Sequence, residues 1–493
     1  MDRKLAIVAL VALSAALTLT GPGLPASAGV SALDPTFGTG GKVLTDFGGA
    51  DDIEDVAVQS DGKIVAVGTQ NQTSSASQFL ARYDNDGALD VSFGAGGKVT
   101  TEFEAAYAVA LQDDGKIVAA GSAGSGPSHV DFALARYNAD GSLDPTFGDG
   151  GKVVTDFNST IDVARGLVIQ PDGKIVVAGS TRPFGPYDKN PPDFALARYN
   201  PNGSLDTTLG GDGKVSTGFN SGWADNGYGI ALATGGKIVV AGWGLPDGAG
   251  GPGVIDVARY NADGSPDASF DGDGRVVSAP GTDNGAFAVV TQPDGRVIVA
   301  GFVDPGLALV RYTARGSLDS SFGLGDGVAY ARGVAYDLVR QPDGKLVAVG
   351  AFRSEFAVAR FTSSGALDRS FYGGEISTDF GAVDTAQAVA LQSNGRIVAG
   401  GSSAQITNGF TTAEDSALAR YLGRPPCKVP NVRGRKLAVA RSAITKAHCR
   451  VGKVRRKASK TVKRGRVVSQ APRAGRTLPN RSKVNLVVSR GRK

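Results

Sequence analysis

Short apolar runs separated by polar turns recur along the chain. In one representative stretch they cover residues 164–170, 174–179, 193–199 and 214–217, each bounded by glycine, asparagine or aspartate. Runs of this length and setting are typical of β-strands joined by turns. Several of them, such as Lys-Ile-Val-Val-Ala at residues 174–178, are apolar on both faces. Because such strands are buried on both sides, the pattern predicts sheets packed on sheets.

The first two runs of this stretch are joined by Gln-Pro-Asp-Gly-Lys at residues 170–174. Asp-Gly pairs are favoured in tight hairpins because both central residues accept a positive φ. The phrase therefore predicts a hairpin turn with positive φ at Asp172 and Gly173, followed by the outgoing strand.

Three landmarks repeat in fixed order, about 50 to 60 residues apart. The first is an aspartate, usually followed by Ser/Thr-Phe-Gly, at Asp34, Asp90, Asp144, Asp206, Asp267, Asp319 and Asp368. The second is an Asp-Gly-Lys turn at Asp61, Asp114, Asp172, Asp294 and Asp343, with weaker versions at Gly235 and Asn394. The third ends an apolar run with an arginine, at Arg82, Arg136, Arg198, Arg259, Arg311, Arg360 and Arg420.

A four-stranded unit repeated seven times predicts a mainly β fold, a seven-bladed β-propeller over residues 29–423. A parallel β-helix is the alternative, although its rungs are shorter and need no hairpins. The ends of the array complement each other, because residues 42–47 match the fourth strand of later copies and the last copy stops after its third strand at Tyr421. We expect the N-terminal strand to complete the last blade.

Residues 143–153, 170–179 and 194–200 together resemble the delta-60 repeat family of bacterial proteins. The resemblance covers about residues 31–422 and implies a propeller-like array in an exported protein, with no activity attached. The fourth copy departs most, with Leu209 in place of phenylalanine and Thr-Gly-Gly at residues 234–236 in place of the usual turn.

The N-terminus carries Arg3 and Lys4, an apolar run over residues 5–19 and the small residues 26–28. This order is typical of a secretory signal peptide, which we expect over residues 1–28. An uncleaved membrane anchor is the alternative, but the run is shorter than the roughly 20 residues that a bilayer span needs. We expect a secreted bacterial protein, extracellular or associated with the cell wall, without a membrane span in the mature chain.

Composition changes abruptly after a predicted linker at residues 424–427. From residue 427 to the end there are 22 Lys and Arg and no Asp or Glu, which gives +22, whereas the preceding residues sum to −17. Leu437, Ala440, Ile444 and Ala447 follow helical spacing, and residues 484–488 alternate as in a strand. One helix on a small sheet is therefore predicted.

Residues 428–491 resemble the PASTA domain, through residues 429–434, the helix over 437–447, and residues 451–454, 465–475 and 484–489. The resemblance implies peptidoglycan or its fragments as the ligand. It is a single copy without an accompanying kinase or transpeptidase domain. Cys427 and Cys449 bracket the expected helix, and an isolated pair in an exported protein predicts a disulfide. Free thiols or a metal pair are the alternatives.

The sequence gives little support for catalysis. The chain has only two histidines, His129 and His448, and this small number nearly excludes a zinc cluster or a histidine-based triad. A catalytic pair of carboxylates of the glycosidase type is an alternative that stays open. A catalytic group is needed once, whereas a packing requirement recurs in every blade. We therefore interpret the seven arginines and seven aspartates as structural and paired with each other. No catalytic residue, metal site or cofactor is predicted.

Differences between copies are the better guide to recognition. Loops at residues 181–192, 244–253 and 405–415 are expected on one face. Trp223 and Trp243 are expected in exposed loops of one repeat with Tyr228 near them, and the three are candidate ligand-binding residues. The alternative is that these aromatics only cover the rim of a blade.

We expect a monomeric binding or structural protein whose basic tail attaches to peptidoglycan or an anionic wall polymer, with a carbohydrate or protein on the propeller. An extracellular glycosidase or lyase is the alternative. Nucleic-acid binding fits the tail's charge but conflicts with export, and no nucleic-acid partner is predicted.

Overall fold

The computed structural model describes residues 32–72, 75–124, 129–157, 161–182, 191–220, 222–246, 251–407, 410–424, 427–478 and 482–492. The expected signal peptide, residues 1–28, lies outside this part of the chain. Contacts divide the protein into two compact units. The first contains Leu33–Arg369 and Gly373–Tyr421, and the second contains the chain from Leu422 onward.

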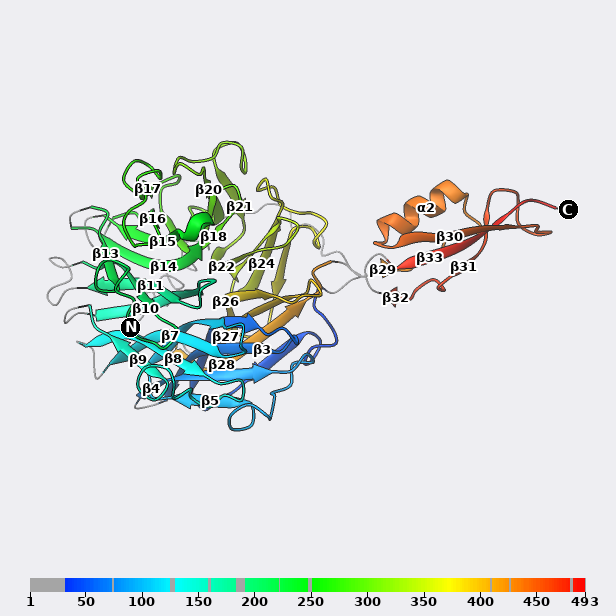
Figure 1. The fold of residues 1–493 in the computed structure, drawn as a ribbon. Coiled ribbons are helices and arrows are strands. Elements are labelled where there is room, and N and C mark those ends of the chain that lie inside the picture. The colour runs from blue at the N-terminus through cyan, green and yellow to red at the C-terminus, as the bar shows by residue number, and fades with distance from the viewer. Residues whose placement is uncertain are drawn as a thin grey trace. The chain divides into compact units, whose positions relative to one another are not determined.

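In the described part of the first unit, 28 strands form seven four-stranded blades, and the fold is the predicted seven-bladed propeller (Figure 1). Single parallel residue pairs, Ala50 with Glu414 and Ile161 with Val130, join two pairs of neighbouring blades into larger sheets. Blades 1 to 6 each take four consecutive strands, and blade 7 ends on β1. The first strands, in blade order, are β2 (Ala50–Val58), β6 (Ala105–Leu111), β10 (Ile161–Ile169), β14 (Ala224–Leu232), β18 (Asn284–Thr291), β22 (Val334–Arg340) and β26 (Val383–Leu391). The second strands are β3 (Ile64–Gln72), β7 (Ile117–Gly124), β11 (Ile175–Arg182), β15 (Ile238–Leu245), β19 (Val297–Val303), β23 (Leu346–Phe352) and β27 (Ile397–Thr407).

The remaining strands complete the blades outward. The third strands are β4 (Ser75–Tyr83), β8 (Val130–Tyr137), β12 (Asp193–Tyr199), β16 (Val254–Tyr260), β20 (Gly306–Tyr312), β24 (Glu355–Phe361) and β28 (Phe410–Tyr421). The fourth are β5 (Lys98–Thr101), β9 (Lys152–Thr155), β13 (Lys214–Thr217), β17 (Arg275–Ser278), β21 (Val328–Ala331), β25 (Glu375–Thr378) and β1 (Lys42–Thr45). A short 3₁₀ turn, η1 (Thr234–Gly236), replaces the usual hairpin phrase in blade 4.

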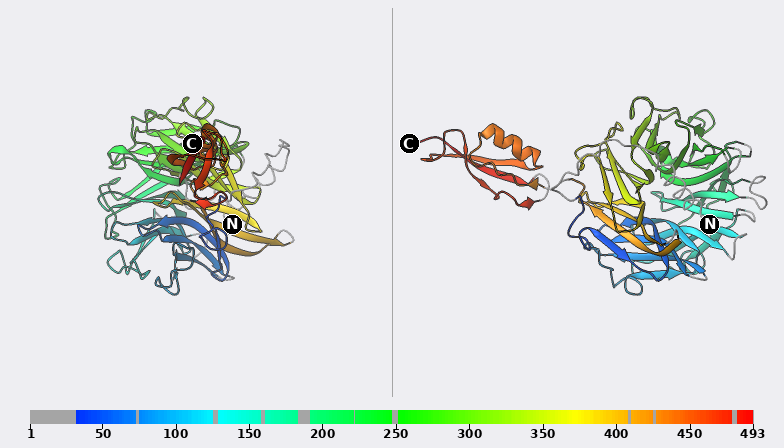
Figure 2. Two further views of the ribbon diagram at one scale, coloured as in Figure 1. Left: turned by 90° about the vertical axis from the view of Figure 1, so that its right-hand side faces the viewer. Right: turned by 180° about the vertical axis from the view of Figure 1, so that it is seen from behind.

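The ring closes through its two chain ends, as expected. Strand β1 pairs antiparallel with β28, from Lys42 opposite Ala419 to Thr45 opposite Ser416. The first strands of neighbouring blades contact each other all the way round, from β2 to β6 and finally from β26 back to β2. These strands therefore surround the propeller axis, and the view from behind in Figure 2 shows the blades arranged around it.

Apolar side chains fill the space between blades because both faces of each central strand are covered. Between blades 3 and 4, Val176 and Leu196 pack with Ile238 and Val240. Every residue of β15 is buried. Burying each such side chain contributes about 1.5 to 3 kcal/mol, and this repeated interface explains why the central strands read as unbroken apolar runs.

The hairpin phrase forms a different turn from the one predicted. Gly173 has φ of 83°, but Asp172 is not among the residues with positive φ. The Gly173 amide donates to the Gln170 carbonyl, and the Gln170 amide donates to the Lys174 carbonyl. This is a three-residue loop, a type I turn closed by a left-handed glycine. Pro171 favours it because its fixed φ suits the second position of a type I turn.

The second unit contains β29 (Cys427–Lys428), α2 (Leu437–Lys446), β30 (Arg450–Lys457), β31 (Val467–Ala471), β32 (Thr477–Leu478) and β33 (Lys483–Ser489). The helix lies where the apolar spacing predicted it. Val432, Ile444 and Leu486 are buried in its core. The predicted disulfide between Cys427 and Cys449 is present and closes a separation of 22 residues. Across the described residues, no helix has both the length and the apolar character needed to span a membrane.

Candidate functional site

The seven repeated arginines and aspartates form one ion pair in each blade. The arginine Nε lies 2.6 to 3.0 Å from a carboxylate oxygen of its aspartate. Six pairs join residues eight apart, and the seventh joins Arg420 to Asp34 across the ring closure. Burial alone would raise the pKa of Asp144, but hydrogen bonds from Thr146 and the charge of Arg136 bring that pKa down to about 2.

Six of these arginines also connect their blade to the next. The Arg259 guanidinium donates to the Ala314 carbonyl of the following blade and lies 4.4 Å from the centre of the Phe270 ring. The same carbonyl contact is made by Arg82, Arg136, Arg198, Arg311 and Arg420. The arginines are thus distributed around the ring and do not gather in a common site.

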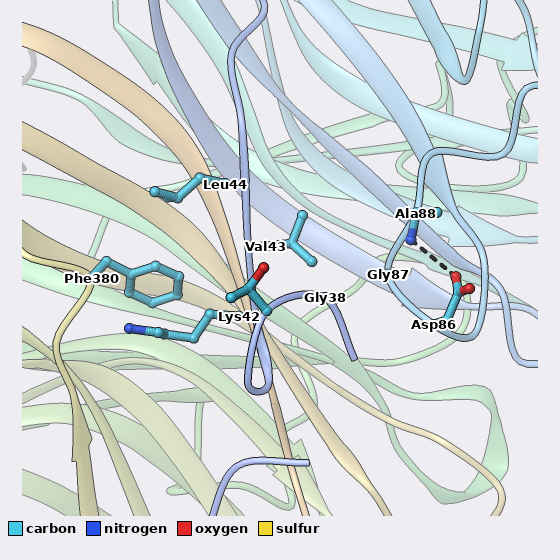
Figure 3. A pocket seen from close by; sticks show the side chains of 9 residues that line it. Gly38, Lys42, Val43, Leu44, Asp86, Gly87, Ala88 and Phe380 are labelled. Atoms are coloured by element: carbon cyan, nitrogen blue, oxygen red, sulfur yellow. Dashed lines mark hydrogen bonds between the residues drawn. The ribbon is translucent and has the colours of Figure 1, made fainter. Parts of the chain in front are cut away.

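A hollow of about 520 Å³ lies where β1 meets blade 1 (Figure 3), lined by Gly38, Thr39, Lys42, Val43, Leu44, Asp86, Gly87, Ala88 and Phe380. Lys42 donates to the Asp379 carbonyl and lies 5.3 Å from the centre of the Phe380 ring. Lys98 makes the same two contacts, with the Asp46 carbonyl and the Phe47 ring. The hollow is therefore built from a packing arrangement that the blades share.

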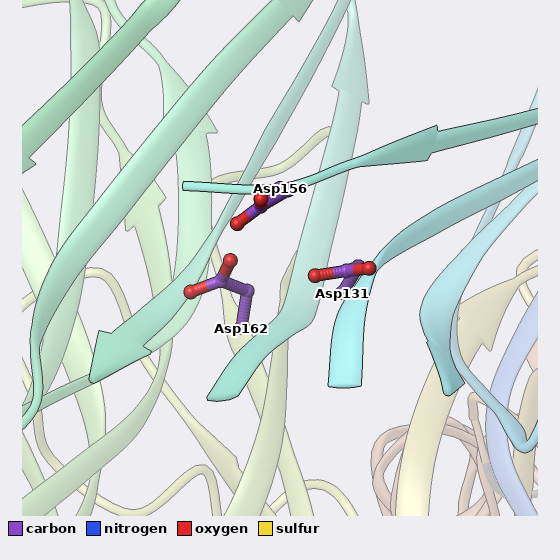
Figure 4. Close-up of side chains that lie close together, drawn as sticks. All are labelled: Asp131, Asp156 and Asp162. Atoms are coloured by element: carbon purple, nitrogen blue, oxygen red, sulfur yellow. The ribbon is translucent and has the colours of Figure 1, made fainter. Parts of the chain in front are cut away.

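Three carboxylates, Asp131, Asp156 and Asp162, have oxygens within 4.8 Å of one another, close enough to hold a cation (Figure 4). Asp162 is fully buried and accepts hydrogen bonds from the Phe157 amide at 2.7 Å and the Thr181 hydroxyl at 2.6 Å. The equivalent aspartates Asp51, Asp225 and Asp384 likewise accept a phenylalanine amide. Because the same hydrogen bond recurs in four blades, the role of Asp162 is explained as structural: its carboxylate holds the turn that leads into the first strand.

A different set of residues converges on the propeller axis. In every blade the pairing of the first and second strands shifts by one residue, which leaves one residue of the first strand as a bulge. We call these seven residues the axial ring: Glu54, Tyr107, Arg165, Tyr228, Phe287, Tyr336 and Gln387. Bulges re-aim a side chain and are frequent beside functional sites.

Contacts within the axial ring run from one blade to the next. The Arg165 guanidinium lies 4.6 Å from the Tyr107 ring centre and 5.3 Å from that of Tyr228. Tyr228 meets Phe287 edge-on at 5.2 Å, and Phe287 lies 5.4 Å from Tyr336. Residues from five successive blades are thus in continuous contact around the axis.

Two aspartates follow the bulge in blades 1 and 6. Asp55 accepts hydrogen bonds from its neighbour Val56 and from Val109 in the next blade, both at 2.7 Å. Asp337 accepts in the same way from Leu338 and from Val389. Burial, and then the negative charge of Asp337, raise the pKa of Asp55 to about 8. Each carboxylate ties a bulge to the adjacent blade.

The three candidate aromatics have separate positions. Tyr228 belongs to the axial ring. The expectation that Trp243 lies in an exposed loop is wrong, because β15 continues past it and the side chain is 9% exposed, packed on Phe302. Trp223 is partly exposed just before β14.

Residues 183–190 and 247–250 of the first two candidate loops lie outside the described residues. The expectation of a loop over residues 405–415 is wrong, because β27 extends to Thr407 and β28 begins at Phe410.

Sequence reasoning did not find the other members of the axial ring. A signal for them exists, since aligned copies show a large residue of changing chemistry between two positions that are mostly alanine or glycine. The bulge residue interrupts the alternation of inward and outward side chains along the first strand. Without that alternation, the sequence of the first strand looks like an ordinary apolar run, and the bulge is missed.

Comparison with protein families identifies the two units. A model described as a domain of unknown function (DUF5122) beta-propeller matches residues 59–93, 112–147, 170–209, 236–270, 292–322 and 341–371. The PASTA domain model matches residues 428–490. The chain is a DUF5122 β-propeller followed by a PASTA domain. This confirms both resemblances seen in the sequence.

Six matched copies correspond to seven blades because the DUF5122 unit of blade 7 is divided. Each matched segment runs from the hairpin through the arginine to the aspartate and the phenylalanine that follows it, which is replaced by Leu209 in one segment. In blade 7 the arginine is Arg420, whereas the aspartate and phenylalanine are Asp34 and Phe37 at the other end of the chain.

Several solved structures are similar to this chain over 63 to 77% of its length. The polysaccharide lyase Uly1 is 13% identical over 75% of this chain and 90% of its own, with a TM-score of 0.44. Sqt1 from Chaetomium thermophilum is 11% identical over 77% and 97%, with a TM-score of 0.43. The α-L-arabinanase of Penicillium chrysogenum, complexed with arabinobiose, is 13% identical over 63% and 91%, with a TM-score of 0.40. No curated protein sequence matches the chain.

The combination of the two units fits a cell-wall-associated protein. PASTA domains bind peptidoglycan-related ligands. A PASTA domain together with a disulfide also suggests an extracellular or wall location.

Proposed function

We propose that this protein is exported, that its PASTA domain attaches it to peptidoglycan or an anionic polymer of the cell wall, and that the DUF5122 propeller binds a second ligand. The observation that carries this proposal is the division of charge, with +22 in residues 427–493 and −17 in the residues before them. No acidic side chain within the PASTA segment neutralises its cations. Such a field attracts polyanions over about a Debye length, roughly 8 to 10 Å.

Strand β30 offers the most concentrated group of these charges. It pairs only with β33 and is therefore an edge of the three-stranded sheet. Arg455, Arg456 and Lys457 are exposed on it. Exposed cations on a sheet edge keep the edge from pairing with other strands and leave the charges accessible to a polymer.

Sedimentation of the full-length protein with purified cell walls tests the attachment. We expect retention at low salt and release as salt rises, because exposed charge pairs are screened. Replacing Arg455, Arg456 and Lys457 with glutamine should lower retention several-fold. Replacing the exposed propeller residues Arg315, Arg353 and Arg369 with glutamine removes the same charge and should leave retention unchanged. Failure of the wild type to be retained at low salt would reject the attachment.

A carbohydrate-active enzyme, a glycosidase or lyase, is the second candidate. One observation favours it. Near the axis, the negative charge of Asp337 helps to raise the pKa of Asp55 to about 8, and a carboxyl with that pKa can donate a proton at neutral pH. Against it, each carboxylate already holds two backbone amides. Release of new sugar ends from wall glycans, lost in Asp55→Asn, would establish the enzyme; no release by the wild type would exclude it for those glycans.

A further inference from the structure

At the axial ring the seven blades share one backbone geometry but carry side chains of different chemistry. The positions on either side of the bulges in blades 2 to 5 and 7 are alanine or glycine, and neighbouring first strands approach closely there. A Cβ added to Gly229 would lie 2.8 Å from the Ala288 backbone of the next blade, and one added to Gly166 would lie 2.8 Å from the Tyr228 carbonyl. The bulge residue itself is acidic, aromatic, basic or an amide, so the fold does not dictate it.

The ring has an aromatic side and a polar side. Tyr107, Tyr228, Phe287 and Tyr336 form the aromatic side across blades 2 to 6, interrupted by Arg165. Phe287 and Tyr336 are only 5% and 7% exposed, whereas Tyr107 and Tyr228 are half-buried, so the two half-buried tyrosines are the accessible rings of the aromatic side. The polar side consists of Gln387 and Glu54, with Asp55 and Asp337 beside them.

We propose that the axial ring is a saccharide-binding site. This inference rests on the proposed function, because it names the ligand class of the propeller. A sugar presents an apolar C–H face, which packs on tyrosine rings, and a rim of hydroxyls, which donate to carboxylates and exchange hydrogen bonds with an amide. The aromatic and polar sides of the ring match these two surfaces.

The charge of the ring separates its ligand from that of the PASTA domain. Glu54 and Asp337 are acidic, and Arg165, the cation of the axial ring, lies between the rings of Tyr107 and Tyr228. Carboxylates repel phosphate and carboxylate polymers. The ring therefore suits a neutral or amino sugar, whereas the PASTA domain suits a polyanion.

A purely structural explanation predicts different behaviour. If the aromatic side only fills the axis, replacing Tyr107 or Tyr228 lowers stability and affects no ligand. Leucine at these positions keeps apolar volume but removes the flat ring and the hydroxyl. Glu54→Gln keeps the shape of the side chain and removes its charge. Tyr330→Leu, on the outermost strand β21, is the matched control for the tyrosine substitutions.

The experiment is a binding titration of the full-length protein against a panel of soluble neutral and amino-sugar oligosaccharides, with thermal unfolding followed for every variant. We expect the wild type to bind at least one member, and Tyr107→Leu, Tyr228→Leu and Glu54→Gln each to weaken that binding about tenfold. Tyr330→Leu should bind like the wild type.

Absence of binding to every oligosaccharide would overturn the inference, as would binding unchanged in all three ring variants. Equal loss in Tyr330→Leu and in the ring variants would also overturn it, because the effect would then come from general destabilisation. If the tyrosine variants do not fold, oligosaccharide binding by Glu54→Gln alone decides whether the axial ring is the site. Wall retention of the same samples reports separately on the PASTA attachment, so the two proposals fail in different measurements.

Discussion

At the scale of single residues, Asp256 is the clearest exception to the repeat. In each blade the third strand places one residue opposite a glycine of the second strand. That residue is alanine in five blades, Phe79 in blade 1 and Asp256 in blade 4. Asp256 is fully buried beside Asp225. Burial and the charge of Asp225 raise the pKa of Asp256 well above its usual value, and burial raises that of Asp225 to about 6.

This pair predicts a pH-dependent stability. A carboxyl whose pKa is raised in the folded state binds its proton more tightly than in the unfolded chain, so stability falls as pH rises from about 4 through 6 and above. Asp256→Ala should flatten that fall and raise the free energy of unfolding by about 1 to 3 kcal/mol at about pH 8. Denaturant unfolding of variant and wild type at about pH 5 and pH 8 measures the difference. An unchanged pH dependence in the variant would contradict the assignment.

At the scale of elements, the unit that repeats is a third strand together with the arginine near its end and that arginine's partners, which we call the arginine cluster. Arg198 binds Asp206 at 2.6 Å, the Thr208 hydroxyl at 2.9 Å and the Ala262 carbonyl of the next blade. Lys174 from the hairpin joins the same aspartate at 2.9 Å. One side chain thus fixes the strand, its turn and the neighbouring blade.

Removing that arginine leaves the buried Asp206 with Lys174 as its remaining cation. We expect Arg198→Leu to lower the free energy of unfolding by about 3 kcal/mol, because a buried charge loses its main partner. Arg198→Leu with Asp206→Leu should recover much of this loss, since no buried charge is then left unpaired and Lys174 is partly exposed to solvent. Thermal or denaturant unfolding of the single and double variants measures both effects. A double variant as unstable as the single one would show that packing, and not charge, causes the loss.

At the scale of the whole molecule, repetition made most of the fold predictable. Every blade needs a hairpin, two doubly buried strands and one arginine cluster, so these requirements appear seven times in the sequence. Closure could also be predicted, because the strand missing at one end is present at the other. The same logic misplaced Trp243, because β15 extends past it to Leu245 and its side chain packs on Phe302 of the next blade.

The axial ring could not be predicted in this way. Its members share a position but not one residue type, so Glu54, Arg165 and Phe287 look unrelated until strand register places them at equivalent positions around the axis. Tyr228 was selected for its aromatic character, and its contacts with Arg165 and Phe287 were invisible in the sequence. Long-range convergence of this kind comes from ring closure, which no local pattern records.

The central claim is that recognition takes place on the axis, apart from both the repeated scaffold and the basic PASTA domain. Photo-cross-linking tests it most directly, using the full-length protein, a diazirine-labelled oligosaccharide that binds in the panel and peptide mapping by mass spectrometry. The account predicts cross-links to the first strands β6, β10 and β14, competed by unlabelled sugar. Competed cross-links confined to the outer strands or to residues 428–490 would contradict it.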